Sequence, residues 1–152
     1  MAVQTVDFLP ALFERDETAW LETIAELTRD GRTMDLDLPH LAEYLSDMAR
    51  RDRRDVESRL VVLLAHLLTR NSQPDHRSGS WRATLIEQRQ ELNRLAGHGV
   101  LGKHAEDVLN EVYPEAVERA SAETGMSSDQ FPARCPYSLE QLLTIELSEA
   151  GD

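Results

Sequence analysis

The stretch that decides the fold is VESRLVVLLAHLLTR, residues 56–70. Its apolar residues Val56, Leu60, Leu63 and Leu67 are four, three and four positions apart, the spacing that places side chains on one face of an α-helix. No Gly or Pro interrupts the chain between Pro39 and this stretch. We therefore expect one long helix over about residues 38–70, with a join between two helices near residues 50–53 as the alternative.

Helical periodicity recurs along the rest of the chain, whereas the sustained apolar–polar alternation that is typical of strands is missing. Further helices are expected over about residues 16–30, 80–96 and 103–124, and from residue 138 onward. The spacing places Trp20, Ile24 and Leu27 on one face of the first of these helices. At the start of the long helix it predicts an apolar stripe of Leu41, Leu45 and Met48.

The ends of the expected helices carry capping signals. Asp16 is an expected N-cap, and Ser138 forms a predicted capping box with Gln141. Gly31 is an expected C-cap, because glycine adopts the left-handed conformation that often ends a helix. Pro114, inside the region 103–124, predicts either a kink or the start of a new helix.

About five amphipathic helices joined by short loops must bury their apolar stripes against one another. The architecture that does so most simply is an all-α, antiparallel helical bundle. A chain of 152 residues has the usual size of one domain. We therefore expect a single helical domain over residues 1–152, in which residues 1–15 form an N-terminal arm.

Charge is distributed unevenly along this acidic chain, whose formal net charge is −12. Residues 1–49 carry a balance of −8, residues 50–94 a balance of +4, and residues 95–152 again −8. Every basic residue of the middle third is Arg, which binds carboxylate or phosphate through two parallel hydrogen bonds. The net charge makes general nucleic-acid binding unlikely, because phosphate repels an acidic surface.

The composition also predicts the compartment. No apolar run approaches the roughly 18 residues that span a bilayer, and the N-terminus lacks the pattern of a signal peptide. A single cysteine, Cys135, is compatible with a reducing compartment. We expect a cytoplasmic protein that does not bind membranes.

Several short stretches together resemble a bacterial family known only as domain of unknown function twenty-nine, and they cover almost the whole chain. They are Leu36–Leu38, Leu41–Glu43, Glu57–Leu60, Leu63–Leu68, Gln73–Pro74, Ser80–Thr84, Gln88–Arg89, Glu123–Gly125, Phe131–Pro132 and Cys135–Glu140. Pro114 departs from the family pattern, in which that region reads as uninterrupted helix. The resemblance implies a small all-α protein, and it brings no activity, substrate or catalytic residue.

His66 is the polar residue that stands out in the apolar run. It shares a helical face with Asp55, Arg59 and Arg70. Arg59 and His66 could thus belong to a half-buried pocket that binds an anion or moves a proton. The alternative, which we favour, is a core histidine hydrogen-bonded to a neighbouring helix, because buried polar groups need partners whatever their function.

A second group of candidate residues opens the expected helix 80–96, after a loop that carries His76 and Arg77. Trp81, Arg82 and Arg89 could receive a phosphate or stack a base near the helix N-terminus. The alternative, again favoured, places Trp81 in the core and pairs the arginines with acidic residues of the flanking segments.

Signals for catalysis and for metal or cofactor binding are weak. His40, Glu43 and Asp47 share one helix face, but a di-iron bundle needs Glu-x-x-His motifs on two helices. Cys135 has no recognisable base, and no Gly-rich phosphate loop is present. We expect no metal, no cofactor and no catalytic residue.

Two hypotheses about function follow. The first is a non-enzymatic interaction module that binds another protein, or a second copy of itself, through acidic helix faces. The second is an anion- or nucleic-acid-binding protein, with phosphoryl-transfer or nuclease-like chemistry around His66, Arg59, Arg82 and Arg89.

Overall fold

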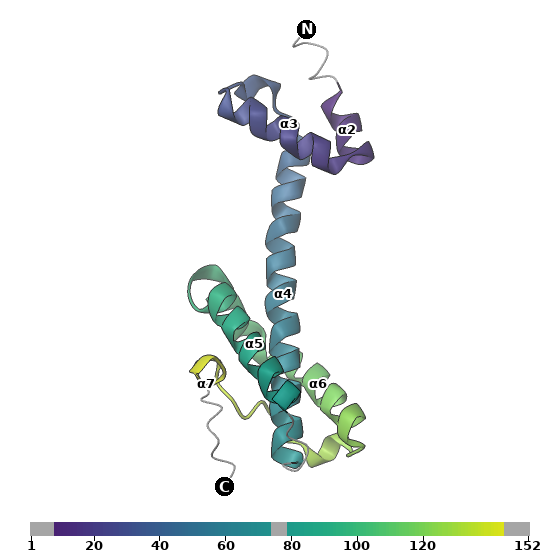
Figure 1. The fold of residues 1–152 in the computed structure, drawn as a ribbon, viewed down its shortest axis with the longest axis vertical. Helices are drawn as coiled ribbons and strands as arrows, with labels where there is room; N and C mark the ends of the chain where they lie inside the picture. The colour runs from purple at the N-terminus through teal and green to yellow at the C-terminus, as the bar shows by residue number, and fades with distance from the viewer. Residues whose placement is uncertain (1–7, 74–78, 145–152) are drawn as a thin grey trace. The chain divides into compact units, whose positions relative to one another are not determined.

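Helix α4 runs without interruption from Leu38 to Ser72 in this computed structural model, which describes residues 8–73 and 79–144. The prediction of one helix is thereby confirmed. The described elements are, in order, α2 (Leu9–Arg15), α3 (Glu17–Arg29), η1 (Thr33–Asp35), α4, α5 (Gly79–Ala96), α6 (Gly99–Thr124), η3 (Ser128–Gln130) and α7 (Leu139–Thr144) (Figure 1). No strand occurs in the described ranges, and the all-α fold of about five packed helices is confirmed.

Residue contacts divide the chain into two units, Met1–Arg50 and Arg51–Asp152, and α4 contributes residues to both. We call them the first and the second unit. That the two units fold as one cooperative domain stays a prediction.

The first unit is built from α2, α3 and the start of α4. Its core consists of Leu9, Trp20, Ile24 and Leu27, so the predicted face of α3 is confirmed. Asp16 caps α3 by accepting a hydrogen bond from the backbone N–H of Ala19 at 3.1 Å.

Two more details of the first unit bear on the sequence predictions. Gly31 follows α3 with φ +68°, as expected of a glycine that ends a helix. Within the expected N-terminal arm of residues 1–15, residues 9–15 form helix α2, and residues 1–7 lie outside the described residues. That helix packs on α3, and its Leu9 is 1% exposed.

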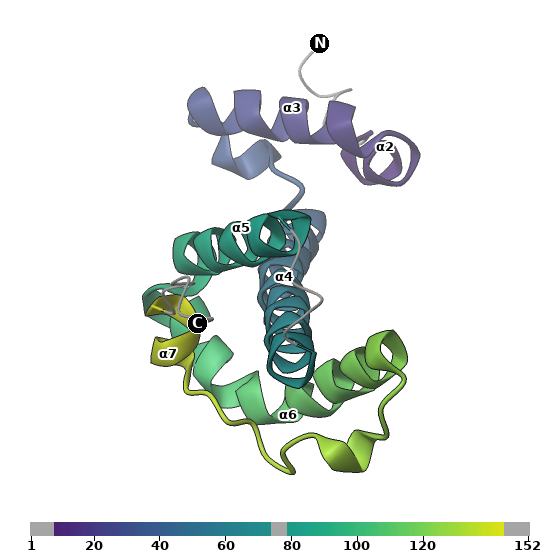
Figure 2. The same cartoon turned by 60° about the horizontal axis from the view of Figure 1, so that its bottom comes forward.

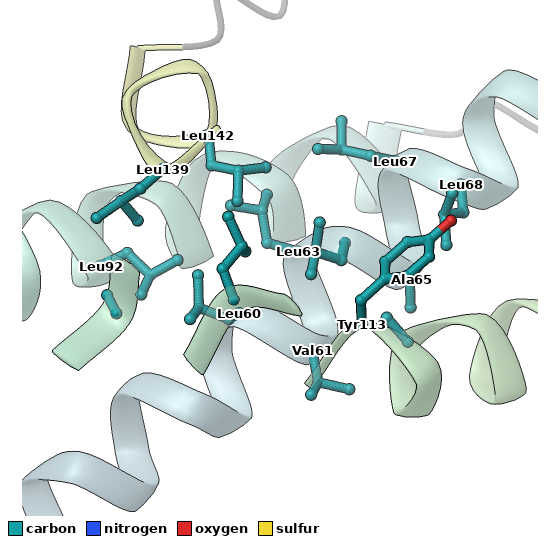
Figure 3. Close-up of a cluster of buried hydrophobic side chains, with 14 of the residues drawn as sticks. Leu60, Val61, Leu63, Ala65, Leu67, Leu68, Leu92, Tyr113, Leu139 and Leu142 are labelled. Atoms are coloured by element: carbon teal, nitrogen blue, oxygen red, sulfur yellow. The ribbon is translucent and has the colours of Figure 1, made fainter. Parts of the chain in front are cut away.

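In the second unit, α5, α6 and α7 gather around the C-terminal part of α4 (Figures 1 and 2). Figure 3 shows the buried side chains that meet there, among them Leu60, Leu63 and Leu67 of α4, Leu92 of α5, Tyr113 of α6, and Leu139 and Leu142 of α7. The apolar face of residues 56–70 is therefore the centre of this core.

Helix α6 continues through Pro114, so neither a new start nor an end occurs there. Proline lacks an N–H group and leaves the carbonyl of Asn110 without its helical donor. The neighbours Tyr113 and Ala116 are 4% and 0% exposed, so packing holds the helix together on both sides of the proline.

The capping box predicted for the last helix is confirmed. The backbone N–H of Ser138 donates to Gln141 Oε1 at 2.8 Å, and the N–H of Gln141 donates to Ser138 Oγ at 3.2 Å. Whatever continues beyond Thr144 lies outside the described residues. Among the helices that the structure describes, none has both the length and the apolar character needed to cross a bilayer.

Candidate interaction site

Arg59, the first of the predicted site residues, connects α4 to α5. Its Nε lies 3.0 Å from Asp55 Oδ1, one turn earlier on α4, and its Nη1 donates to Gln88 Oε1 at 3.2 Å. The contact of Arg59 Nε with Asp55 is an ion pair without hydrogen-bond geometry, since Nε is buried and has no hydrogen-bond partner. The Arg59 side chain is 25% exposed, and of its two contacts only the hydrogen bond to Gln88 joins α4 to α5.

His66 is half-buried, and its partner lies on its own helix. Its Nδ1 is 2.8 Å from the carbonyl oxygen of Val62, one turn earlier in α4. Since a carbonyl only accepts hydrogen bonds, Nδ1 carries the proton. His66 is thus hydrogen-bonded, as the favoured alternative expects, although to its own helix rather than to a neighbouring one.

The three candidates on α5 differ in their surroundings. Trp81 packs, partly buried, against the core of the second unit, and the guanidinium of Arg70 lies 5.9 Å from its ring centroid. Arg82 is exposed and Arg89 is half-buried. His76 and Arg77, from the preceding loop, lie outside the described residues.

The four pockets described in the second unit do not gather these candidates. Four pockets in the described part of the second unit are lined by residues of α5, α6, α7 and the segments that connect them. Arg59, His66, Trp81, Arg82 and Arg89 line none of the four. An anion site built from these residues therefore stays a prediction.

A polar cluster that the sequence did not reveal lies in the first unit, around Asp37. This carboxylate is 8% exposed, and its Oδ2 accepts hydrogen bonds from Trp20 Nε1 at 3.1 Å and from His40 Nδ1 at 2.8 Å. The His40 ring is also stacked on the ring of Phe13, with 4.4 Å between the two ring centroids. His40 Nε2 lies 3.7 Å from Glu14 Oε1.

The Asp37 cluster is explained by its position at the start of α4. Asp37 Oδ1 also lies 3.5 Å from the backbone N–H of His40, the geometry of a long N-cap contact. One buried carboxylate therefore starts α4 and fixes the indole of Trp20. The cluster includes no Ser, Thr or Cys nucleophile among its hydrogen-bonding partners, and the described residues contain no group of three side chains that could hold a metal ion.

Helix α4 presents an apolar stripe to solvent in the first unit. Leu38, Ala42, Leu45 and Ala49 are all exposed, the two leucines at 58% and 59%. They are four, three and four positions apart, so they form one continuous face. We call these four residues the α4 stripe.

The α4 stripe corrects the stripe predicted from the sequence. Leu41 and Met48 are half-buried as expected, but Leu45 points away from the core. The reason is the orientation of α4: the cluster around Asp37, together with Tyr44 packed near Trp20, decides which face turns inward. The sequence contains two overlapping stripes that share Leu45, the predicted one and the α4 stripe. Their spacing alone does not indicate which of the two is buried.

Comparison with known proteins supplies a family and no activity. Residues 12–147 match the family described as "Domain of unknown function DUF29". No curated protein and no solved structure matches the chain. The family match covers far more than half of the chain, so this all-α protein belongs to the DUF29 family.

Proposed function

We propose that this protein is a non-enzymatic interaction module that binds a helix of another protein, or of a second copy of itself, through the α4 stripe. The observation that carries the proposal is the exposure of Leu38 and Leu45 on one helix face, with Ala42 and Ala49 between and beyond them. Apolar residues at such spacing are the seam along which two helices pack.

The pattern of large and small residues suits a partner helix. Each alanine leaves a shallow hollow beside a leucine, so a large apolar side chain of the partner fits over Ala42 or Ala49. Single exposed leucines are common on protein surfaces, but a continuous apolar face marks an interaction site.

The acidic surroundings favour a partner with basic flanks. Residues 1–49 carry a balance of −8, and Glu43 next to the stripe is exposed. Opposite charges at the rim speed association and select among partners, while the buried apolar contact supplies most of the affinity. Acidic helix faces thus contribute selectivity in this proposal.

Light scattering after size-exclusion chromatography, combined with affinity capture from the source cells, tests the proposal. The double variant Leu38→Ser/Leu45→Ser is expected to lose whichever association the unmodified chain shows, the homodimer or the captured partner. Val100→Ser is the matched control, because Val100 is a 69% exposed apolar residue in the second unit. A double variant that associates as well as the control would contradict the proposal.

The second hypothesis, an anion or nucleic-acid site around His66, Arg59, Arg82 and Arg89, has less support. The guanidinium of Arg59 is engaged with Asp55 and Gln88, and His66 Nδ1 with Val62. The second hypothesis can be tested directly, because it predicts that Arg82→Ala weakens the binding of a phosphate-bearing ligand such as a short oligonucleotide. Unchanged binding would remove Arg82 from that site.

A further inference from the structure

A row of hollows runs along α6, where the chain returns after Thr124 and lies against that helix. Their volumes are 480, 310, 570 and 640 Å³. Neighbouring hollows share lining residues: the first and second share Pro114, the second and third share Asn110, and the third and fourth share Glu106. They therefore adjoin and form one groove, which we call the α6 groove.

The wall of the groove opposite α6 is fixed in place. Tyr113 Oη donates to the carbonyl of Pro132 at 2.7 Å, and Ser121 Oγ donates to the carbonyl of Met126 at 2.6 Å. Phe131 and Leu139 anchor this wall in the core, at 6% and 7% exposed. A groove with fixed walls loses little conformational entropy when a ligand binds.

Carboxylates are concentrated at the two ends of the groove. Glu118 and Asp129 line the first hollow, Glu106 and Glu140 line both the third and the last, and Asp107 lines the last. None of these five carboxylates forms an ion pair within the described residues.

Among the described residues that line the groove, the basic side chains besides His98 are Lys103 and Arg134. Lys103 lies at the end that holds Glu106, and Arg134 lies in the middle, where no carboxylate lines the hollow. Carboxylates that have no ion pair of their own are available to basic groups of a partner. The charge pattern along the groove is thus acidic, then basic, then acidic.

We propose that the α6 groove binds an extended segment of another protein that carries two basic side chains about five or six residues apart. Glu106 and Glu118 are twelve residues apart on α6, which is about 18 Å at the helical rise of 1.5 Å per residue. An extended chain covers that distance in about five or six residues at roughly 3.3 Å each.

The hollow lined by Arg134 and the first hollow each set a further requirement for the sequence of the bound segment. Opposite Arg134 the segment carries a neutral or acidic residue, since a basic one would be repelled. In the first hollow Val117, Phe131 and Pro132 provide apolar contact beside Glu118, so an apolar side chain next to the first basic residue fits there.

This site goes beyond the proposed function, because it lies in the second unit and needs nothing from the α4 stripe. Substitutions at Leu38 and Leu45 therefore leave it unchanged. Conversely, substitutions in the α6 groove leave the association through the α4 stripe unchanged, so failure of one proposal is distinguishable from failure of the other.

The probe is a fluorescein-labelled peptide, Gly-Arg-Leu-Ala-Ser-Ala-Arg-Gly, titrated with the full chain and followed by fluorescence anisotropy. The control peptide, Gly-Ala-Leu-Arg-Arg-Ala-Ser-Gly, has the same composition with adjacent arginines. We expect the spaced peptide to bind about fivefold more tightly or better, because only it reaches both acidic ends. Raising the salt concentration should weaken its binding.

Matched variants locate the site. Glu106→Gln and Glu118→Gln should each weaken binding of the spaced peptide about two- to fivefold, the range for one exposed ion pair. Glu111→Gln is the control, since Glu111 is exposed on the same helix and lines none of the hollows. Ala133→Trp, at an exposed position between the first two hollows, should block binding by filling them.

Three results would overturn the proposal: equal binding of the two peptides, equal effects of Glu111→Gln and Glu118→Gln, or unchanged binding to Ala133→Trp. Each of these results would mean that the peptide does not bind in the α6 groove. Circular dichroism of every variant checks that the fold is retained, and the exposed positions of these residues make this the expected result.

Discussion

The core of the second unit gathers twenty buried apolar residues from four helices and the segment before α7, whereas that of the first unit, in the same described ranges, has four and a buried carboxylate. Residues of the first unit also include most of the large apolar side chains left exposed: Phe8, Met34, Leu38 and Leu45. The second unit thus covers most of its apolar faces internally. The first unit combines a small apolar core with polar contacts and leaves apolar surface exposed.

The largest expected effect is the loss of a leucine from the core of the second unit. Leu64 is 0% exposed, so Leu64→Ala should lower the free energy of unfolding by about 2–5 kcal/mol, through lost burial and the cavity that remains. Urea denaturation followed by far-UV circular dichroism measures it.

The same variant tests whether the two units fold as one domain. In a Trp81→Phe background, the fluorescence of Trp20 reports on the first unit alone. If the chain is one cooperative domain, the fluorescence transition shifts together with the circular dichroism transition. A fluorescence midpoint that stays in place would show that the units unfold separately.

The next effect is expected from the polar cluster of the first unit. Asp37→Ala leaves the buried N–H of Trp20 without an acceptor and removes a contact at the start of α4. The cost should be about 1–3 kcal/mol, read from Trp20 fluorescence during denaturation. Asp35→Asn, which alters the more exposed Arg32–Asp35 pair, is the control and should cost less. Equal costs would mean that the cluster does not stabilise the first unit.

A smaller effect, dependent on pH, is expected at Tyr113. Burial is the main cause that raises the pKa of Tyr113, with smaller contributions from Cys135 and Tyr137, and burial also raises the pKa of the Cys135 thiol. A group whose pKa is raised by folding favours the folded state at low pH. That contribution is lost as the pH rises from the unfolded pKa through the folded pKa.

Stability should therefore fall as the pH rises above the ordinary range of these groups, about 8.5 for Cys and 10 for Tyr. Tyr113→Phe removes the bond to Pro132 and should cost about 0.5–1.5 kcal/mol at neutral pH. It should also lose less stability than the unmodified chain between neutral and alkaline pH. The urea midpoints of the unmodified chain and of Tyr113→Phe, measured at pH 7 and at alkaline pH, test this expectation. If stability depends on pH identically in both proteins, burial does not raise the pKa of Tyr113.

The smallest effect is expected at the α4 stripe. Leu45 is 59% exposed, so Leu45→Ala should change the free energy of unfolding by less than about 0.5 kcal/mol. Chemical denaturation at low protein concentration measures it. A loss comparable to that of Leu64→Ala would mean that Leu45 is covered within the chain, and the contrast between the units would disappear.

Periodicity was sufficient to predict the long helix, the helix boundaries near Asp16 and Ser138, and the all-α class, because these depend on local spacing and capping. Helix α2 was not predicted, since its seven residues are too few to show a period and Leu9 is buried only through contact with α3. The assignment of Leu45 to the core failed for a similar reason: two stripes overlap on α4, and tertiary contacts choose between them.

The candidate sites were harder to predict. Arg59 and His66 do lie on one helix as expected, but side-chain partners such as Gln88 and the Val62 carbonyl depend on how the helices pack and on rotamers. Asp37 directly precedes the helix expected over about residues 38–70. Its bond to Trp20, seventeen residues away, has no local signal.

A photo-crosslinking amino acid placed at Ala42, in the middle of the α4 stripe, shows whether a partner covers this face. Irradiation of the source cells should yield a covalent adduct with a partner protein or a second copy of the chain. The same amino acid at Val100, exposed in the second unit, should yield no such adduct. Equal products at both positions, or none at Ala42, would contradict the claim that the first unit keeps this face for a partner.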